Sequence, residues 1–234
     1  MAISIYITGD THRDFSRIYN FCERAGTTKD DIMIILGDAG INYYLLGMDD
    51  NLKSELSMLP ITLFCIHGNH EERPSNINSY GEQQWHEGTV YVEPRFPSLI
   101  FAKDGEIYDF HGQKFIAIGG AYSVDKYIRL MRGYQWFESE QPSAEIKAYV
   151  EQQLDNIAWQ IDGVLSHTTP KSYEPAWAFL SGIDQSRVDK STEEWLDKIE
   201  KKLKYKYWYA GHFHVDSQEG PIKIMFQTIE KLSV

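Results

Sequence analysis

The sequence predicts an α/β fold in which helices cover a largely parallel sheet. Apolar runs of strand length alternate with amphipathic segments through the first part of the chain, the order expected of β-α-β-α-β units. The run Asp31–Leu36 is almost continuously apolar, which is typical of a strand buried on both faces. A hairpin signal near the middle of the chain adds antiparallel strands, so we expect mixed sheets overall.

Residue spacing and helix-start and helix-stop signals predict where the first strands and helices lie. Asp14 can cap a helix whose apolar residues, from Phe15 to Ala25, recur at helical spacing, and Gly26 stops that helix. Leucines at regular intervals before Pro60 predict a second helix. In chain order, we expect a strand at 3–8, a helix from 14 to 26, a strand at 31–36, a helix around 52–59 and a strand at 61–66.

The later elements are predicted in the same way. His111-Gly112 supplies the turn of a hairpin, Ser143 is placed to cap a helix, and Ser191 with Glu194 has the spacing of a capping box. Residues 168–190 form the longest irregular stretch, and we expect them to wall the functional site because they directly follow His167. The remaining strands are expected at 106–110, 114–118, 163–165, 205–210 and 222–226.

Composition limits the class of protein. The 234 residues, 42% hydrophobic and 24% charged, are ordinary for a globular protein, and we expect one domain spanning 1–234. The formal net charge of −11 argues against extended nucleic acid as a partner. The N-terminus has the pattern of a strand and not of a signal peptide, and no apolar stretch approaches the roughly 20 residues of a membrane span. We therefore expect a cytoplasmic protein with no membrane partner.

Short motifs of aspartate, asparagine and histidine carry the functional signal. Each follows an apolar run, at the carboxyl end of a predicted strand, where open α/β sheets bind their ligands. Adjacent glycines allow the backbone to turn sharply and approach closely. The motifs are Gly9-Asp10-Thr11-His12, Gly37-Asp38, Gly68-Asn69-His70-Glu71, Ser166-His167 and Gly211-His212-Phe213-His214.

These motifs offer an oxygen and nitrogen ligand set without thiolate, which suits divalent metals such as Mn, Fe or Zn. The set is too large for one tetrahedral ion and fits two ions that share a bridging carboxylate, the arrangement used for displacement at phosphorus. The two cysteines, Cys22 and Cys65, have no metal or redox spacing. The candidate ligands are Asp10, His12, Asp38, Asn69, His167, His212 and His214.

Taken in order from residue 9 to residue 214, the motifs resemble those of the calcineurin-like metallophosphoesterase superfamily. The resemblance implies a four-layer α/β/β/α sandwich with two mixed sheets face to face. It also implies a binuclear centre that hydrolyses phosphate mono- or diesters with a metal-activated hydroxide. We expect Mn as the metal, with Fe, Zn, Ni or Mg as alternatives.

The resemblance also implies roles for individual residues. One ion would take Asp10, His12, Asp38 and His214, and the other would take Asp38, Asn69, His167 and His212, so that Asp38 bridges. His70 would be a catalytic histidine that does not bind metal. Glu71 has two open roles, either orienting His70 or capping a helix.

The sequence departs from the protein serine/threonine phosphatases of this superfamily. Those enzymes continue the second Gly-Asp motif as Asp-Arg-Gly, whereas Gly37-Asp38 continues here as Ala39-Gly40. This departure argues against a protein phosphatase, and the resemblance does not fix the substrate. We expect a small or nucleotide-like phosphoester. The alternatives are a protein serine/threonine phosphatase or a nuclease of the same superfamily or, in a different class, a non-catalytic protein-binding scaffold. The sequence does not predict the oligomeric state.

Cations near the motifs are candidate substrate contacts. Arg13 and Arg73 adjoin site motifs, and Lys126 and Arg129 lie in a segment of three cations and three tyrosines after Gly119-Gly120. Such a segment could grip a phosphate and stack on a ring. For each cation the alternative is an ordinary surface role.

Overall fold

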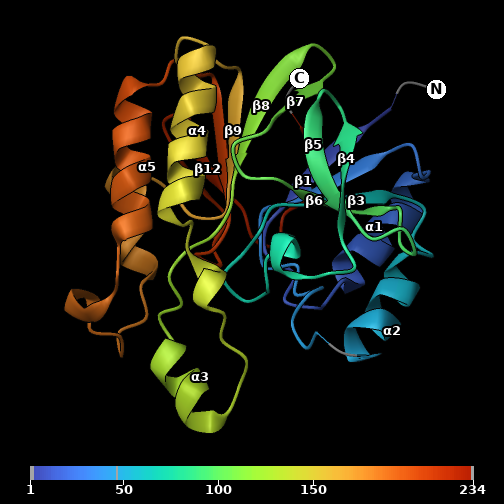
Figure 1. Ribbon diagram of the computed structural model, residues 1–234, viewed down its shortest axis with the longest axis horizontal. Coiled ribbons are helices and arrows are strands. Elements are labelled where there is room, and N and C mark those ends of the chain that lie inside the picture. Colours follow the sequence, from blue (N-terminus) through green and yellow to red (C-terminus); the bar gives the residue numbers. More distant parts are fainter. Residues whose placement is uncertain (1–2, 46, 233–234) are drawn as a thin grey trace.

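Two mixed β-sheets pack face to face with helices on both outer sides. The computed structural model describes residues 3–45 and 47–232. Helices α1 and α2 cover one outer face and α4 and α5 cover the other (Figure 1). The predicted four-layer α/β/β/α sandwich is confirmed.

The first sheet has the strand order β13-β1-β2-β3-β6-β5-β4. The strands from β1 to β6 in that order are parallel, and β13, β5 and β4 run antiparallel to their neighbours. The parallel start confirms the predicted β-α-β-α-β opening. Its strands are β1 (Ile5–Thr8), β2 (Ile32–Ile35), β3 (Thr62–Cys65), β4 (Gly81–Trp85), β5 (Gly88–Val92), β6 (Leu99–Ala102) and β13 (Glu230–Lys231).

The second sheet has the order β11-β12-β10-β9-β8-β7. Its four central strands are parallel, and the antiparallel pair β7 and β8 forms the predicted hairpin around His111-Gly112. The strands are β7 (Ile107–Phe110), β8 (Gln113–Ile118), β9 (Gly163–Ser166), β10 (Tyr207–Ala210), β11 (Ser217–Glu219) and β12 (Ile222–Ile224).

Three hydrophobic clusters join the four layers. The central cluster lies between the sheets and includes Ile34 and Phe64 from one sheet and Phe115 and Leu165 from the other. A second cluster packs the outer face of the first sheet against α1 and α2, and a third packs the second sheet against α4 and α5. Strand β2 is buried throughout because it contributes alternate residues to two of these clusters, which explains its continuously apolar sequence.

The helices begin and end close to the predicted signals. The Asp14 carboxylate accepts hydrogen bonds from the backbone and hydroxyl of Ser16, and Gly26 ends α1 in the left-handed conformation. Ser143 caps α4 by accepting from the Ile146 N–H. The longer helices are α1 (Ser16–Ala25), α2 (Gly47–Leu56), α3 (Lys126–Arg132), α4 (Ala144–Asn156) and α5 (Ser191–Lys202).

The predicted capping box at Ser191 is wrong. Ser191 is the first residue of α5, and its hydroxyl donates to the Gln141 side chain at 3.3 Å. The Asp189 carboxylate accepts from the Ser191 N–H at 2.9 Å and takes the place that the box assigned to serine. The Asp189 carboxylate, two residues before Ser191, thus accepts from a backbone N–H at the start of α5.

Segment 168–190 is irregular, as predicted, with short turns at η3 (Lys171–Tyr173), η4 (Ala176–Ala178) and η5 (Gln185–Arg187). Two further turns, η1 (Pro74–Asn76) and η2 (Glu138–Glu140), lie in other connections. Helix α3 projects away from the sheets (Figure 1) and buries none of its residues. Within the described ranges, no helix is long and apolar enough to cross a membrane.

Candidate metal centre

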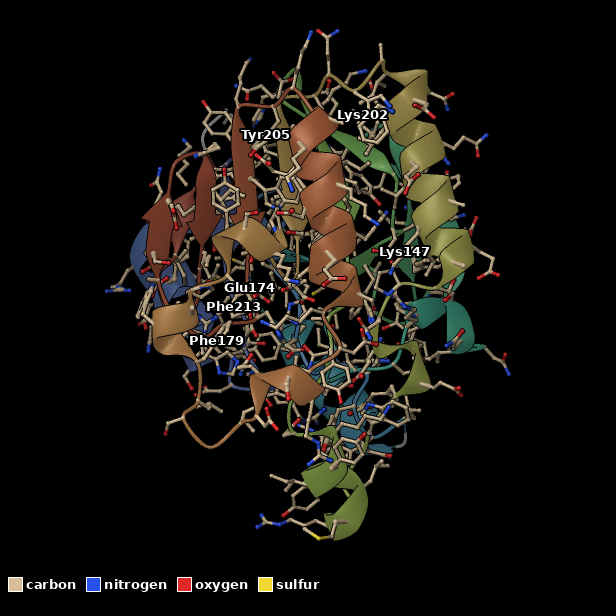
Figure 2. The ribbon with its side chains drawn as sticks, turned by 90° about the vertical axis from the view of Figure 1, so that its left-hand side faces the viewer. Lys147, Glu174, Phe179, Lys202, Tyr205 and Phe213 are labelled. Carbon is tan, nitrogen blue, oxygen red and sulfur yellow. The ribbon has the colours of Figure 1, made fainter. Side chains whose placement is uncertain are left out.

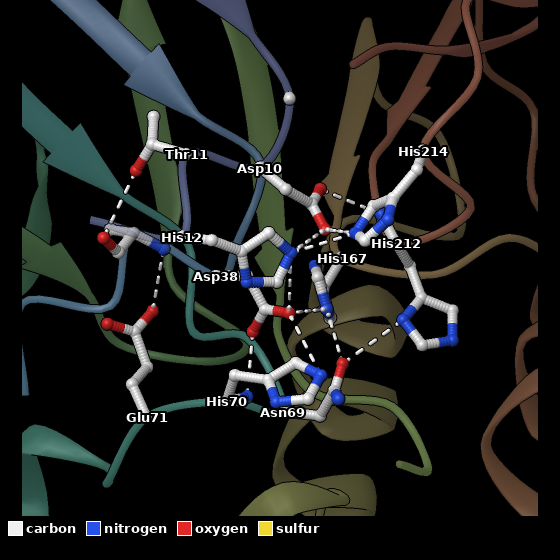
Figure 3. A network of polar contacts seen from close by, with 12 residues as sticks. Asp10, Thr11, His12, Asp38, Asn69, His70, Glu71, His167, His212 and His214 are labelled. Atoms are coloured by element: carbon white, nitrogen blue, oxygen red, sulfur yellow. Dashed lines mark hydrogen bonds and ion pairs between the residues drawn. The ribbon is translucent and has the colours of Figure 1, made fainter. Parts of the chain in front are cut away.

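The sequence motifs converge at one edge of the sandwich (Figure 3). The first three follow β1, β2 and β3 of one sheet, and the last two follow β9 and β10 of the other. Because these parallel strands end on the same side, loops far apart in the sequence meet there. The backbone also ties them together, since the Gly211 N–H donates to the His167 carbonyl at 2.8 Å.

The two buried aspartates are held in the same way. The His212 N–H donates to Oδ1 of Asp10 at 2.9 Å, and the His70 N–H donates to Oδ1 of Asp38 at 2.7 Å. Each carboxylate therefore keeps its second oxygen for the centre of the site. Oδ2 of Asp10 is buried and accepts no hydrogen bond from the described residues. A buried carboxylate oxygen without a partner is costly, and a metal ion would satisfy it.

One group of donor atoms surrounds this oxygen. Nε2 of His214 lies 3.3 Å and Nε2 of His12 lies 3.6 Å from Oδ2 of Asp10. The two imidazole nitrogens lie 2.8 Å from each other. Nitrogen lone pairs and a carboxylate oxygen directed at one point form the donor set of a divalent ion.

A second group lies beside the first. Nδ1 of His167 donates to the Leu36 carbonyl at 2.8 Å, and Nε2 of the same ring faces Oδ1 of Asn69, also 2.8 Å away. Nδ1 of His212 faces the same Oδ1 at 3.1 Å, and the amide orientation is set by Nδ2 of Asn69 donating to Ser123. Nitrogen and oxygen atoms gathered in this way can bind a cation between them. A histidine that binds a metal through one ring nitrogen usually donates a hydrogen bond from the other, as Nδ1 of His167 does to the Leu36 carbonyl.

Asp38 lies between the two groups. Its Oδ2 is 3.8 Å from Nε2 of His12, 3.7 Å from Nε2 of His167 and 3.8 Å from Nε2 of His70. Burial opposes its ionisation, but these imidazoles and the His70 N–H outweigh burial and hold the pKa of Asp38 below its ordinary value. The Asp38 carboxylate is therefore charged, and its Oδ2 lies within 4 Å of imidazole nitrogens of both groups.

The histidine pKa values diverge across the site. Burial lowers the pKa of His212 to about 3, whereas the Asp10 carboxylate, with Oδ2 3.3 Å from Nε2 of His214, raises the pKa of His214. Burial also lowers the pKa of His70, although Asp38 opposes that effect. His212 is therefore neutral at physiological pH, the form in which imidazole binds metal.

Backbone strain is concentrated in these motifs. His12, Asp38, His212 and His214 all have positive φ, between 46° and 71°, although none is glycine. Such conformations cost of order 1–3 kcal/mol each and gather at functional sites. Close approach adds a further constraint, because a Cβ on Gly37 would lie 2.0 Å from Nδ1 of His167.

Glu71 takes neither of its two predicted roles. Its buried carboxylate accepts from the Ala39 N–H at 3.2 Å, and no helix begins at this position. Burial, followed by the Asp38 charge, raises the pKa of Glu71 to about 8. The side chain therefore holds the loop that carries Asp38, a role that requires a contact across the fold.

The side chains of two candidate substrate-binding residues, Arg13 and Arg73, make contacts within the protein. Arg13 donates to the Gly40 carbonyl and to Asp49, both at 2.6 Å. Arg73 is buried and pairs with Asp104. Neither arginine lines the pocket beside the centre, which is formed partly by His70, His212 and His214. Their contact with substrate stays a prediction.

Lys126 and Arg129 are also engaged. The Lys126 ammonium lies 3.8 Å from the centre of the Trp136 ring, and Arg129 pairs with Asp125 at 2.8 Å. Within the segment that carries them, Tyr122, Val124 and Asp125 line the pocket. Contact of the two cations with substrate stays a prediction as well.

The predicted wall of the site is present. Residues of the 168–190 segment, among them Phe179 and Val188, line the pocket together with His70 and His212. Sequence reasoning missed Glu193, a buried carboxyl of α5 that also lines it. A glutamate in the first turn of a helix ordinarily faces solvent, so the sequence carried no signal for it.

The protein family that the sequence matches agrees with the donor atoms found at this site. Residues 3–216 match the family model of the calcineurin-like phosphoesterases, and the chain belongs to that family. No curated protein is similar enough in sequence to count as a relative.

Solved structures share the fold. The protein TT1561 of Thermus thermophilus aligns with a TM-score of 0.53 at 12% identity, covering 98% of each chain. Phosphopantetheinyl hydrolase from Mycobacterium tuberculosis aligns with a TM-score of 0.53 at 12% identity, covering 95% of this chain and 88% of that one. As a member of the calcineurin-like phosphoesterase family, the chain is a hydrolase of phosphoric esters. That family uses divalent metals, and the Asp and His groups of this chain are able to bind them.

Proposed function

We propose that this protein hydrolyses small phosphate mono- or diesters at a centre of two divalent ions, with Mn as the preferred metal. One ion takes Asp10, His12, Asp38 and His214, and the other takes Asp38, Asn69, His167 and His212. The observation that carries the proposal is the position of Oδ2 of Asp38, within 4 Å of imidazole nitrogens from both groups.

The types and positions of the donor atoms support this assignment. The unpartnered buried oxygen of Asp10 would be satisfied by a cation, and Nε2 of His167 and Oδ1 of Asn69, 2.8 Å apart, are donor atoms of the kind that a divalent ion binds. When bound, two such ions supply an activated water and neutralise charge on the phosphoryl oxygens. The chain's own part is to hold these donors rigidly, and the hydrogen bonds from His70 and His212 to the aspartates do so.

His70 is the proposed proton donor. Its backbone fixes Asp38, while its ring lines the pocket, with Nε2 3.8 Å from Oδ2 of Asp38. Nδ1 of His70 makes no hydrogen bond within 3–45 and 47–232. A ring that borders both the centre and the pocket can protonate the leaving oxygen of a bound ester.

The proposed substrate is small and carries an organic group, and a nucleotide is one example. The pocket beside the centre has a volume of about 400 Å³, within the usual range for small-ligand sites.

Chelation tests the proposed function. Purified protein is stripped with a chelator, dialysed and assayed on 4-nitrophenyl phosphate and bis(4-nitrophenyl) phosphate with each divalent metal in turn. We expect no activity without metal and the largest recovery with Mn. Full turnover of either ester by metal-free protein would contradict the proposal.

A further inference from the structure

A pocket opens directly from the metal centre, with the 168–190 segment on one side. Asp38, Asn69, His70, His212 and His214 border it at one end. A phosphoryl group at the centre would therefore place its organic group in the same continuous cavity. The rest of the lining decides which organic groups fit.

Most of that lining is apolar. The rings of Phe179 and Phe213 lie nearly parallel, with centroids 6.2 Å apart and an interplanar angle of 22°. They come from separate segments and lie together beside Glu174 (Figure 2). The other apolar lining residues are Val124, Ala178, Leu180, Ile183, Val188 and Val215. Such a wall stabilises an apolar or flat ring group by removing it from water.

One buried carboxyl interrupts this wall. Glu193 is 4% exposed, and its Oε1 accepts a hydrogen bond from the Thr168 hydroxyl at 2.9 Å. Its Oε2 has no hydrogen-bond partner anywhere in the described part of the chain. Glu174, which also lines the pocket, differs because Lys190 pairs with it at 2.7 Å. Glu193 therefore supplies an unused acceptor.

The unused oxygen is costly for the fold. A buried polar atom without a partner destabilises a protein, and such atoms are rare in native structures. Burial raises the pKa of Glu193 to about 7, which reflects the same missing solvation. A ligand that presents an N–H or O–H to Oε2 would recover this cost.

We propose that this pocket selects phosphoesters whose organic group is a ring bearing a hydrogen-bond donor, such as an amino-substituted aryl or heteroaryl group, and that Oε2 of Glu193 accepts from that donor. The inference rests on the proposed function, because the phosphoryl group must lie at the metal centre. Phe179 and Phe213 contact the ring, and Glu193 distinguishes a ring with a donor from a plain one.

The test compares phenyl phosphate with 3-aminophenyl phosphate, whose leaving phenols have nearly the same acidity. In assays at pH 8, where Glu193 is ionised because the pH lies above its raised pKa, we expect the metal-loaded wild type to hydrolyse the amino ester with a kcat/KM roughly tenfold higher or more, the effect of one hydrogen bond to a charged acceptor. In Glu193→Gln the ratio should fall to about one, because the amide oxygen keeps the Thr168 bond and the amide NH₂ faces the ligand.

The matched control is Glu194→Gln on the same helix turn. Glu194 is exposed and pairs with Lys171 at 2.6 Å, so this change should leave the ratio at its wild-type value. Equal kcat/KM for the two esters in the wild type would overturn the inference, whether or not the Glu193→Gln variant folds. A preference that persists in Glu193→Gln would overturn the role of Glu193.

Failure of the proposed function gives a different result, in which metal-loaded wild type hydrolyses neither ester. The pocket is then tested without turnover, by NMR titration of phenol and 3-aminophenol into the wild type. Tighter binding of 3-aminophenol, lost in Glu193→Gln and kept in Glu194→Gln, would support the inference. Equal binding of the two phenols would contradict it.

Discussion

The backbone N–H of His212 donates to Oδ1 of Asp10 across 202 residues of sequence, at 2.9 Å. This bond joins the first motif of one sheet to the last motif of the other. It fixes the rotation of the Asp10 carboxylate and leaves Oδ2 for the centre. The His70 N–H does the same for Asp38. Two ligand loops thus each orient a ligand of another loop, and the bond from His212 to Asp10 links the two sheets at the site.

His70→Ala separates proton donation from metal binding. Because His70 is assigned no ligand role, metal content should stay near two ions per chain. Turnover should fall by roughly 10²–10⁴-fold, the usual contribution of general acid catalysis. The loss should be smaller for 4-nitrophenyl esters than for alkyl esters, since a good leaving group needs little protonation. Steady-state kinetics and elemental analysis give both numbers, and a missing ion in the variant would refute the assignment.

Glu71 is expected to act through the loop that carries Asp38. Glu71→Ala removes the acceptor of the buried Ala39 N–H and should cost about 1–3 kcal/mol of unfolding free energy, with a matching fall in activity. Glu71→Gln keeps an oxygen at the same place and serves as the control. Denaturant unfolding measures both variants. Equal stability of the Ala variant and the wild type would show that the bond contributes nothing.

Glu193 should make stability depend on pH. Its pKa is raised to about 7 in the folded protein, from 4.5, mainly by burial, with Glu174 adding to the shift and Lys190 and Thr168 opposing it. The folded state therefore holds a proton that the unfolded state releases, so this contribution is complete below about pH 4.5 and is lost as pH rises through 7.

The expected loss is measured against Glu193→Gln, whose side chain does not titrate. Between pH 5 and pH 8 the wild type should lose up to about 3 kcal/mol relative to the variant, because folding raises the pKa of Glu193 from 4.5 to about 7. Both proteins are measured without metal, so that the metal-binding side chains contribute equally to the pH dependence of the two stabilities. Parallel stability curves across this range would show that Glu193 is solvated in the folded state.

The sequence predicted the parts of this site that depend on local order. Asp10, Asp38 and Asn69 follow strands whose apolar runs are plain, and the sheet topology brings strand ends together whatever the loops do. The four layers came from the family resemblance, because periodicity alone places strands but does not pair two sheets. Contacts across the fold were not predictable, and the bond from Ala39 to Glu71 is one example.

The residues that line the pocket were also only partly predictable from the sequence. Segment 168–190 was expected near the site because it follows His167, and it does line the pocket. Its neighbour Glu193 carried no such signal, because a charged residue at a helix start is ordinarily solvated. Burial of Glu193 arises from the way α5 packs behind Thr168, which no local pattern encodes.

The number and coupling of bound metal ions test the central claim most directly. Metal-depleted wild type and Asp38→Asn are titrated with Mn²⁺ and followed by electron paramagnetic resonance. If Asp38 bridges, the wild type should bind two ions per chain with an exchange-coupled signal. Asp38→Asn should lose the coupling and at least about 100-fold in activity, as expected for a lost ligand. A single ion per wild-type chain, or two uncoupled ions, would contradict the shared carboxylate.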